Sequence, residues 1–134
     1  MNPHERGFLT FLTEPGRSRL MRLLDLGEKR RRDACQLLHD AVRLDPRYST
    51  HLVGSDDFAP RIEQWLRERG APETCYLFSA FADLDGREMP LIEALDDTSS
   101  GDAGVFISCL PGRLGFFRYA SPEAGYLLHR PVNS

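Results

Sequence analysis

The chain has 134 residues, of which 41% are hydrophobic and 28% are charged, a composition typical of globular proteins that excludes a disordered chain. This length suits one domain, so we expect residues 1–134 to form a single domain that needs no metal or disulfide to fold. The net charge of −3 combines an excess of three basic residues in 1–47 with an excess of six acidic residues in 48–134, which argues against a dedicated nucleic-acid binder.

Membrane and secretory signals are absent from the sequence. No apolar run approaches the roughly 20 residues that span a bilayer, and the polar N-terminus leads only into a short apolar patch from Phe8 to Leu12. The three cysteines, Cys35, Cys75 and Cys109, are widely spaced and form neither a disulfide framework nor a C-x-x-C motif. We therefore expect a cytoplasmic protein with reduced thiols and no contact with a membrane.

Helical spacing dominates the first half of the chain. Apolar residues fall on one side of a helix over about 4–13, and again over about 18–44. Gly27 lies within the second range, so that range is either one helix or two helices broken at Gly27. A third helix is expected over about 56–69, with Ser55, Asp56 and Asp57 as capping side chains and Gly70 at its end.

Strand-like patterns dominate the second half. Residues of about 74–81, 103–110, 114–119 and 125–130 read as strands, and Pro90 suits the first turn of a short helix over about 90–97. Pro111-Gly112 favours a type II turn, which fits a two-residue hairpin poorly and predicts a longer loop or a bulge. The sequence thus predicts an α+β fold, with helices packed on one face of a small, mostly antiparallel four-stranded sheet.

Candidates for nucleophilic catalysis are few and have no motif around them. A reactive cysteine needs partial exposure and a histidine base, whereas the apolar neighbours of Cys109 favour a core position. A small hydrolase or transferase site near the strand ends would have to combine one nucleophile, one base and one orienting acid from Cys109 or Ser108, His129 or His51, and Asp83 or Asp85.

No metal or cofactor site is expected. The Asp83–Glu88 segment lacks the spacing of a calcium loop, because with Gly86 at loop position 6 the first and last ligand positions fall on Phe81 and Ile92. The segment reads instead as a turn. The histidines show no metal-binding spacing, and no glycine-rich loop leads into a helix to hold phosphate.

One basic run stands out, at Arg30, Arg31 and Arg32. These side chains could contact nucleic acid, but acidic residues flank the run and no aromatic residues are interleaved for base stacking. Nucleic-acid binding is therefore the weakest of three functional hypotheses.

Aromatic residues gather on the last strands. Alternation places Phe116 and Phe117 on opposite faces of the sheet, with Tyr119 and Tyr126 nearby. One aromatic face either contacts a partner or is covered by the chain's own helices. The hypothesis we favour is a non-catalytic interaction or regulatory module that binds a protein partner, or itself as a homodimer, through these four residues. An acidic protein of this kind could mask a basic partner.

Overall fold

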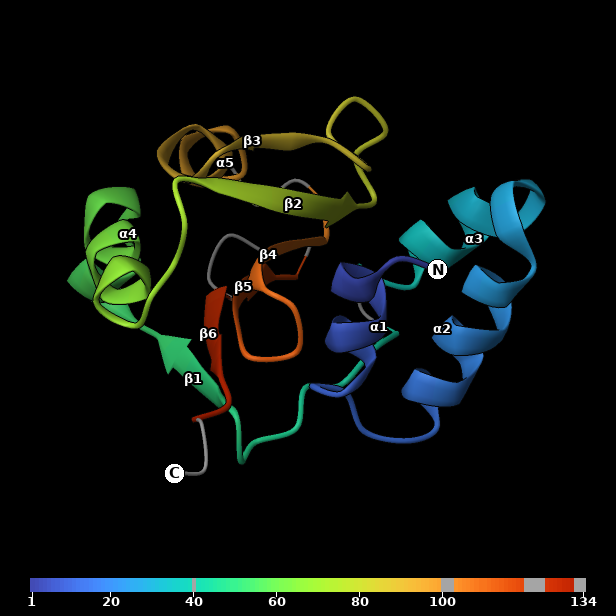
Figure 1. Cartoon of the computed structure of the whole chain (residues 1–134). Helices are drawn as coiled ribbons and strands as arrows, with labels where there is room; N and C mark the ends of the chain where they lie inside the picture. The colour runs from blue at the N-terminus through green and yellow to red at the C-terminus, as the bar shows by residue number, and fades with distance from the viewer. Residues whose placement is uncertain (40, 100–102, 120–124, 132–134) are drawn as a thin grey trace.

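The computed structural model describes residues 1–39, 41–99, 103–119 and 125–131. Within these ranges the chain forms one six-stranded antiparallel sheet with helices on both faces (Figure 1). The helices are α1 (Pro3–Leu9), α2 (Gly16–Asp25), η1 (Gly27–Arg30), α3 (Arg31–Gln36), η2 (Gly54–Asp56), α4 (Ala59–Glu68) and α5 (Leu91–Asp97). The strands are β1 (Ser49–Leu52), β2 (Thr74–Ser79), β3 (Glu88–Pro90), β4 (Val105–Leu110), β5 (Leu114–Arg118) and β6 (Gly125–His129).

The α+β class is confirmed, but the predicted four-stranded sheet is wrong. The strand order is β1-β6-β5-β4-β2-β3, so the four predicted strands form the centre and two short strands extend the edges. Strand β1 pairs with β6, and β3 pairs with β2 over three residues. Both edge strands are too short to show clear alternation, and β3 ends at Pro90, a residue type that marks edges or helix starts.

The two faces of the sheet support separate cores. Helices α1, α2 and α3 cover one face and pack against Phe78, Phe106 and Phe117. Helices α4 and α5 cover the other face and pack against Leu77, Ile107 and Phe116. Figure 1 shows the first group of helices on the right of the sheet and the second group on the left and above it. The expectation that helices cover one face is therefore wrong, whereas the alternation of Phe116 and Phe117 is confirmed.

The N-terminal helical layer is broken at Gly27. Helix α2 stops at Asp25, and Gly27 follows with φ +77°, a left-handed conformation that glycine adopts at little cost. The chain then makes the 3-10 turn η1 and enters α3. Of the two alternatives for residues 18–44, two helices broken at Gly27 is the one confirmed. The break directs the first residue of α3, Arg31, toward the sheet.

Two local predictions have opposite outcomes. The longer loop or bulge expected at Pro111-Gly112 is confirmed: Leu110 pairs with Leu114 across a turn of residues 111–113, and the β4–β5 register shifts just before it, between Ser108 and Leu110. Gly112 in this turn has φ +71°. The capping role of residues 55–57 is wrong, because α4 begins after Phe58 without a side-chain cap. Asp57 instead pairs with Arg118 of β5, with Oδ1 2.6 Å from Nη2. A buried arginine on a strand attracts this carboxylate more strongly than a helix start does.

Candidate functional site

Arg31 forms the centre of a buried polar cluster where the N-terminal helices meet the sheet. We use "polar cluster" for Glu5, Arg31, Cys35, Tyr76 and Asp85. The Arg31 guanidinium donates from Nη1 to Glu5 Oε2 at 2.6 Å, and from Nε and Nη2 to the two oxygens of Asp85, each at 2.9 Å. This bidentate geometry is the strongest that arginine makes with a carboxylate.

Local structure explains why these charges meet. Glu5 lies in the first turn of α1, where the Asn2 side chain accepts the Glu5 N–H and fixes the start of the helix. Asp85 lies in the turn between β2 and β3, and its Oδ1 accepts the Ser79 N–H at 3.1 Å. Gly86, at φ +78°, lets the chain reverse there.

Tyr76 of β2 extends the polar cluster toward β4. Its hydroxyl donates to Glu5 Oε2 at 2.5 Å, and the His4 ring stacks on the Tyr76 ring with centroids 5.1 Å apart. His4 Nδ1 also lies 2.7 Å from the hydroxyl of Ser108, the cross-strand neighbour of Tyr76. Hydrogen bonds and ring contacts thus run from Ser108 to Asp85.

Arg31 and Asp85 keep their charges near neutral pH. Burial opposes ionisation of Asp85, but the hydrogen bonds from Arg31 and from the Ser79 N–H hold its pKa below the ordinary value. Burial also opposes the charge on Arg31, and its two carboxylate partners raise its pKa nonetheless. Burial and the neighbouring Glu5 raise the pKa of Tyr76 to about 12. Burial and the neighbouring Asp85 raise the pKa of Cys35 to about 12, so both groups stay protonated.

A cleft of about 350 Å³ opens beside the polar cluster. Glu5, Arg31, Tyr76 and Asp85 of the polar cluster line it, together with Glu28 of η1. The lining carries the three carboxylates of Glu5, Glu28 and Asp85 against the Arg31 guanidinium and the Met1 α-ammonium, an excess of one negative charge. An arrangement of this kind favours a cationic ligand group.

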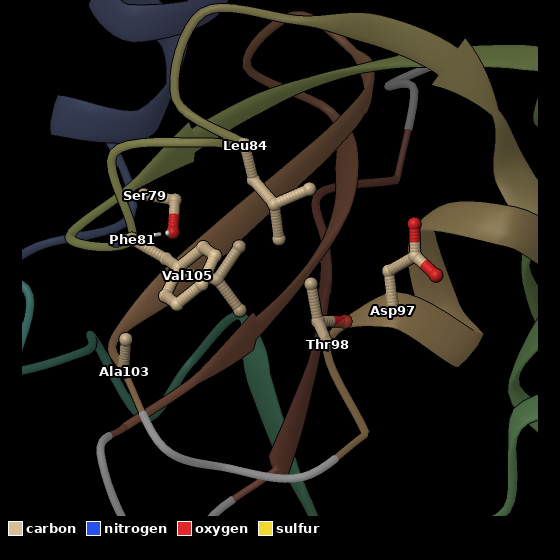
Figure 2. A pocket seen from close by; sticks show the side chains of 7 residues that line it. All are labelled: Ser79, Phe81, Leu84, Asp97, Thr98, Ala103 and Val105. Carbon is tan, nitrogen blue, oxygen red and sulfur yellow. Dashed lines mark hydrogen bonds between the residues drawn. The ribbon is translucent and has the colours of Figure 1, made fainter.

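A second hollow, of about 130 Å³, lies on the other side of the β2–β3 turn (Figure 2). Phe81, Leu84 and Val105 supply an apolar wall, and Figure 2 shows the Asp97 carboxylate at its edge. The two hollows share the turn, because Asp85 and Gly86 line the cleft while Phe81 and Leu84 line the second hollow.

Five exposed carboxylates belong to the β2–β3 turn, to β3 and to α5, and we call them the acidic surface. Within the described ranges none of them forms an ion pair, and Arg87 is the one basic residue in the same stretch of chain. The members are Asp83, Glu88, Glu93, Asp96 and Asp97. Their unneutralised charge favours cations at this surface.

The structure does not assemble the predicted nucleophile, base and acid. Cys109 is buried in the core between the sheet and α4–α5, where burial and the neighbouring Cys75 raise its thiol pKa. Ser108 is fully buried. The histidine it meets is His4, which the sequence did not single out.

The other members of the predicted catalytic group lie apart from these two. His129 packs edge-on against Trp65, and burial, with Arg69 and Arg113, lowers its pKa. His51 stacks on Tyr126. Asp83 is exposed on the acidic surface, whereas Asp85 belongs to the polar cluster.

The predicted partner-binding aromatic residues lie in or next to the sheet, between the two layers of helices. Phe117 and Phe116 are buried, one in each core. Tyr119 and Tyr126 are partly exposed, and the Tyr119 hydroxyl donates to the Val42 carbonyl at 3.0 Å. The sheet faces are therefore covered by the chain's own helices, which leaves these aromatic residues little surface for a partner.

The basic run does not form a single charged face. Arg30 pairs with Asp33 in solvent, Arg31 is partly buried in the polar cluster, and Arg32 donates to the Ala80 carbonyl at 2.8 Å. A phosphate backbone would meet these three side chains already engaged with protein groups.

Sequence reasoning missed Glu5, Tyr76 and His4. One signal pointed to Glu5: it stands four residues before Leu9 and seven before Leu12, on the apolar side of its helix. A carboxylate on a buried face needs a partner, which predicts a buried cation. That the cation is Arg31 depends on the break at Gly27, which the sequence left open.

No group of three or more histidine, cysteine or acidic residues in the described ranges is arranged to hold a metal ion. None of the described helices has the length and apolar character that a membrane crossing requires. Comparison with family models, curated proteins and solved structures found no match to this chain.

Proposed function

We propose that this protein is a non-catalytic interaction module that binds a basic segment of a partner protein at the cleft and the acidic surface beside it. The observation that carries the proposal is the cleft of about 350 Å³ whose lining holds three carboxylates against one guanidinium and one α-ammonium. A lysine or arginine of a partner that enters the cleft gains attraction from charges that are already in place.

Glu5 is suited to receive such a group. Its side chain is 4% exposed, and both of its side-chain contacts within the described ranges use Oε2. Its second oxygen, Oε1, is left for a ligand. Because Arg31 and Tyr76 hold the carboxylate in place, little side-chain entropy is lost when a cation binds.

The buried positions of the candidate nucleophiles support a non-catalytic role. Catalysis by a thiol or hydroxyl requires that substrate reach the nucleophile, whereas Cys35, Cys75, Cys109 and Ser108 are all buried. Burial also raises the thiol pKa values, which suppresses the reactive thiolate.

Binding to a capped hexalysine peptide tests the proposal. We expect fluorescence anisotropy to show binding that weakens as salt rises, and we expect Glu28→Lys to weaken it about tenfold, which corresponds to ~1.4 kcal/mol. Glu68→Lys is the matched control, because it makes the same charge change at an exposed position of α4 outside the cleft. Equal weakening by the two variants would show that only net charge matters and would remove the cleft from the proposal.

A small enzyme is the second candidate, and the Ser108–His4 contact favours it. A serine hydroxyl 2.7 Å from an imidazole nitrogen has the geometry of a nucleophile and its base. A fluorophosphonate probe separates the two functions: covalent labelling of Ser108 in the native protein, abolished in His4→Ala, would replace the binding proposal with hydrolysis. Because Ser108 is fully buried, we expect no labelling of the native protein.

A further inference from the structure

The second hollow has a mixed lining, in which apolar side chains lie beside the polar groups of Ser79, Asp97 and Thr98. Phe81 and Leu84 come from the β2–β3 turn, and Ala103 and Val105 come from the segment that enters β4 (Figure 2). Its volume of about 130 Å³ is the size of one side chain rather than of a larger ligand. The space therefore fits a single inserted hydrocarbon chain.

The hydroxyl groups in the hollow bond within the chain itself. Ser79 Oγ accepts the Phe81 N–H at 2.9 Å, and Thr98 Oγ1 donates to the Ala94 carbonyl at 2.7 Å. Neither hydroxyl must find a partner in an occupant of the hollow. A buried apolar stem thus leaves no polar group of the wall without a hydrogen bond.

Asp97 gives the edge of the hollow its charge. It is the last residue of α5, exposed, and forms no ion pair within the described part of the chain. The last carbonyls of a helix carry partial negative charge, which adds to the attraction for a cation at this end of α5. Apolar walls with a single carboxylate at the edge call for an occupant that is hydrocarbon along its length and positive at its tip.

We infer that this hollow is an anchor pocket for one lysine side chain of the basic partner, an inference that rests on the proposed function. The four methylene groups of the lysine pack against Phe81, Leu84 and Val105, and its ammonium meets Asp97. Lysine fits better than arginine, because a guanidinium has five N–H donors in a fixed fork and the hollow offers one unengaged carboxylate.

Titration with Nα-acetyl-lysine methylamide, followed by methyl NMR, tests the anchor pocket. We expect saturable shifts of the Leu84, Val105 and Thr98 methyl groups at millimolar concentration, which corresponds to about −4 kcal/mol. The norleucine analogue keeps the hydrocarbon stem without the ammonium, and we expect it to bind about tenfold more weakly. No shift at these methyl groups, or equal binding of the two analogues, overturns the inference.

Asp97→Asn and Glu68→Gln form a matched pair of variants, since both residues are exposed carboxylates but only Asp97 lines the hollow. We expect Asp97→Asn to abolish the preference for lysine over norleucine and Glu68→Gln to preserve it; equal effects overturn the anchor pocket. If hexalysine still binds through Glu28 while Asp97→Asn changes nothing, the proposed function stands and the lysine pocket fails. If neither Glu28→Lys nor Asp97→Asn affects hexalysine binding, the proposed function and the lysine pocket both fail.

Discussion

Arg31 shows how far the role of one residue can depart from its sequence neighbourhood. It stands in a run of basic residues that reads as a solvent-exposed face, yet the fold partly buries it between Glu5 and Asp85. Its neighbours Arg30 and Arg32 remain exposed. The helical rotation between neighbouring residues turns one of the three arginines inward. The sequence of the basic run does not predict which one.

Replacing Arg31 with methionine tests the energy of this buried arrangement. The variant leaves two carboxylates without their cation, so we expect the free energy of unfolding in urea to fall by about 3–5 kcal/mol. Arg30→Met removes an ion pair whose two side chains are half exposed, and we expect a loss of about 1 kcal/mol or less. Similar losses in the two variants would mean that the polar cluster contributes no more than a surface pair.

Asp85 gives the protein a defined response to acid. Its folded pKa lies below the ordinary value, so its stabilising contribution is fully present above about pH 3.9 and is lost as the pH falls through the folded pKa. We therefore expect the unfolding free energy of the wild type to drop more steeply between about pH 5 and pH 2 than that of Asp85→Asn. Asp83→Asn, which changes an exposed carboxylate of the same turn, should keep the wild-type slope.

At the scale of elements, the position of α1 depends on a close approach of backbones. A Cβ atom at Gly7 would lie 2.2 Å from the backbone nitrogen of Gly112, in the turn between β4 and β5. Alanine normally favours a helix over glycine by about 1 kcal/mol. Here we expect Gly7→Ala to destabilise the protein by about 1–3 kcal/mol, because the added methyl group pushes α1 off the turn.

Thermal unfolding of Gly7→Ala beside Arg6→Ala measures this contact. Arg6 is exposed on the same helix, and its replacement should change stability by less than about 0.5 kcal/mol. If Gly7→Ala were as stable as the wild type or more stable, intrinsic helix propensity would outweigh the packing of α1 on the β4–β5 turn.

The elements that the sequence predicts best are those with long periodic patterns. Helix α4 and the central strands β2, β4, β5 and β6 lie where hydrophobic periodicity places them. The edge strands β1 and β3 escaped prediction, because four and three residues are too few for a period. Pro90 misled in part: it does precede a helix, as expected, but it also ends β3.

At the scale of the whole molecule, the three cysteines are distributed over both cores, so their reactivity can follow the unfolding of each core. Cys35 lies in the core under α1–α3, while Cys75 and Cys109 lie in the core under α4–α5. We expect all three thiols of the native protein to resist labelling at about pH 8 and to react together when it unfolds, because burial removes access and raises their pKa values.

Mass spectrometry of partly labelled protein reads the order in which the thiols open. Simultaneous labelling indicates one cooperative unit that includes both faces of the sheet. Labelling of Cys35 well before Cys75 and Cys109 would show that the helical layer detaches by itself. It would also contradict the expectation that residues 1–134 form a single domain.

The sequence by itself determined the α+β class, the helical first half and the strands at the centre of the sheet. It did so because periodicity and turn residues act over a few neighbouring positions. Local patterns also identified the acidic second half, which holds the acidic surface together with Tyr76 and Asp85 of the polar cluster. The same features could be predicted from the sequence of any chain that folds with the same local preferences.

Only the tertiary structure decided which polar residues meet. Glu5, Arg31, Tyr76 and Asp85 come from four separate elements, and their contacts span 26 to 71 residues of sequence. Their meeting depends on the break at Gly27 and on the placement of helices on both faces of the sheet. Long-range packing of this kind forms the cleft and buries the aromatic strands. The candidate binding surface is therefore the cleft with the acidic surface, and not the aromatic face of the sheet.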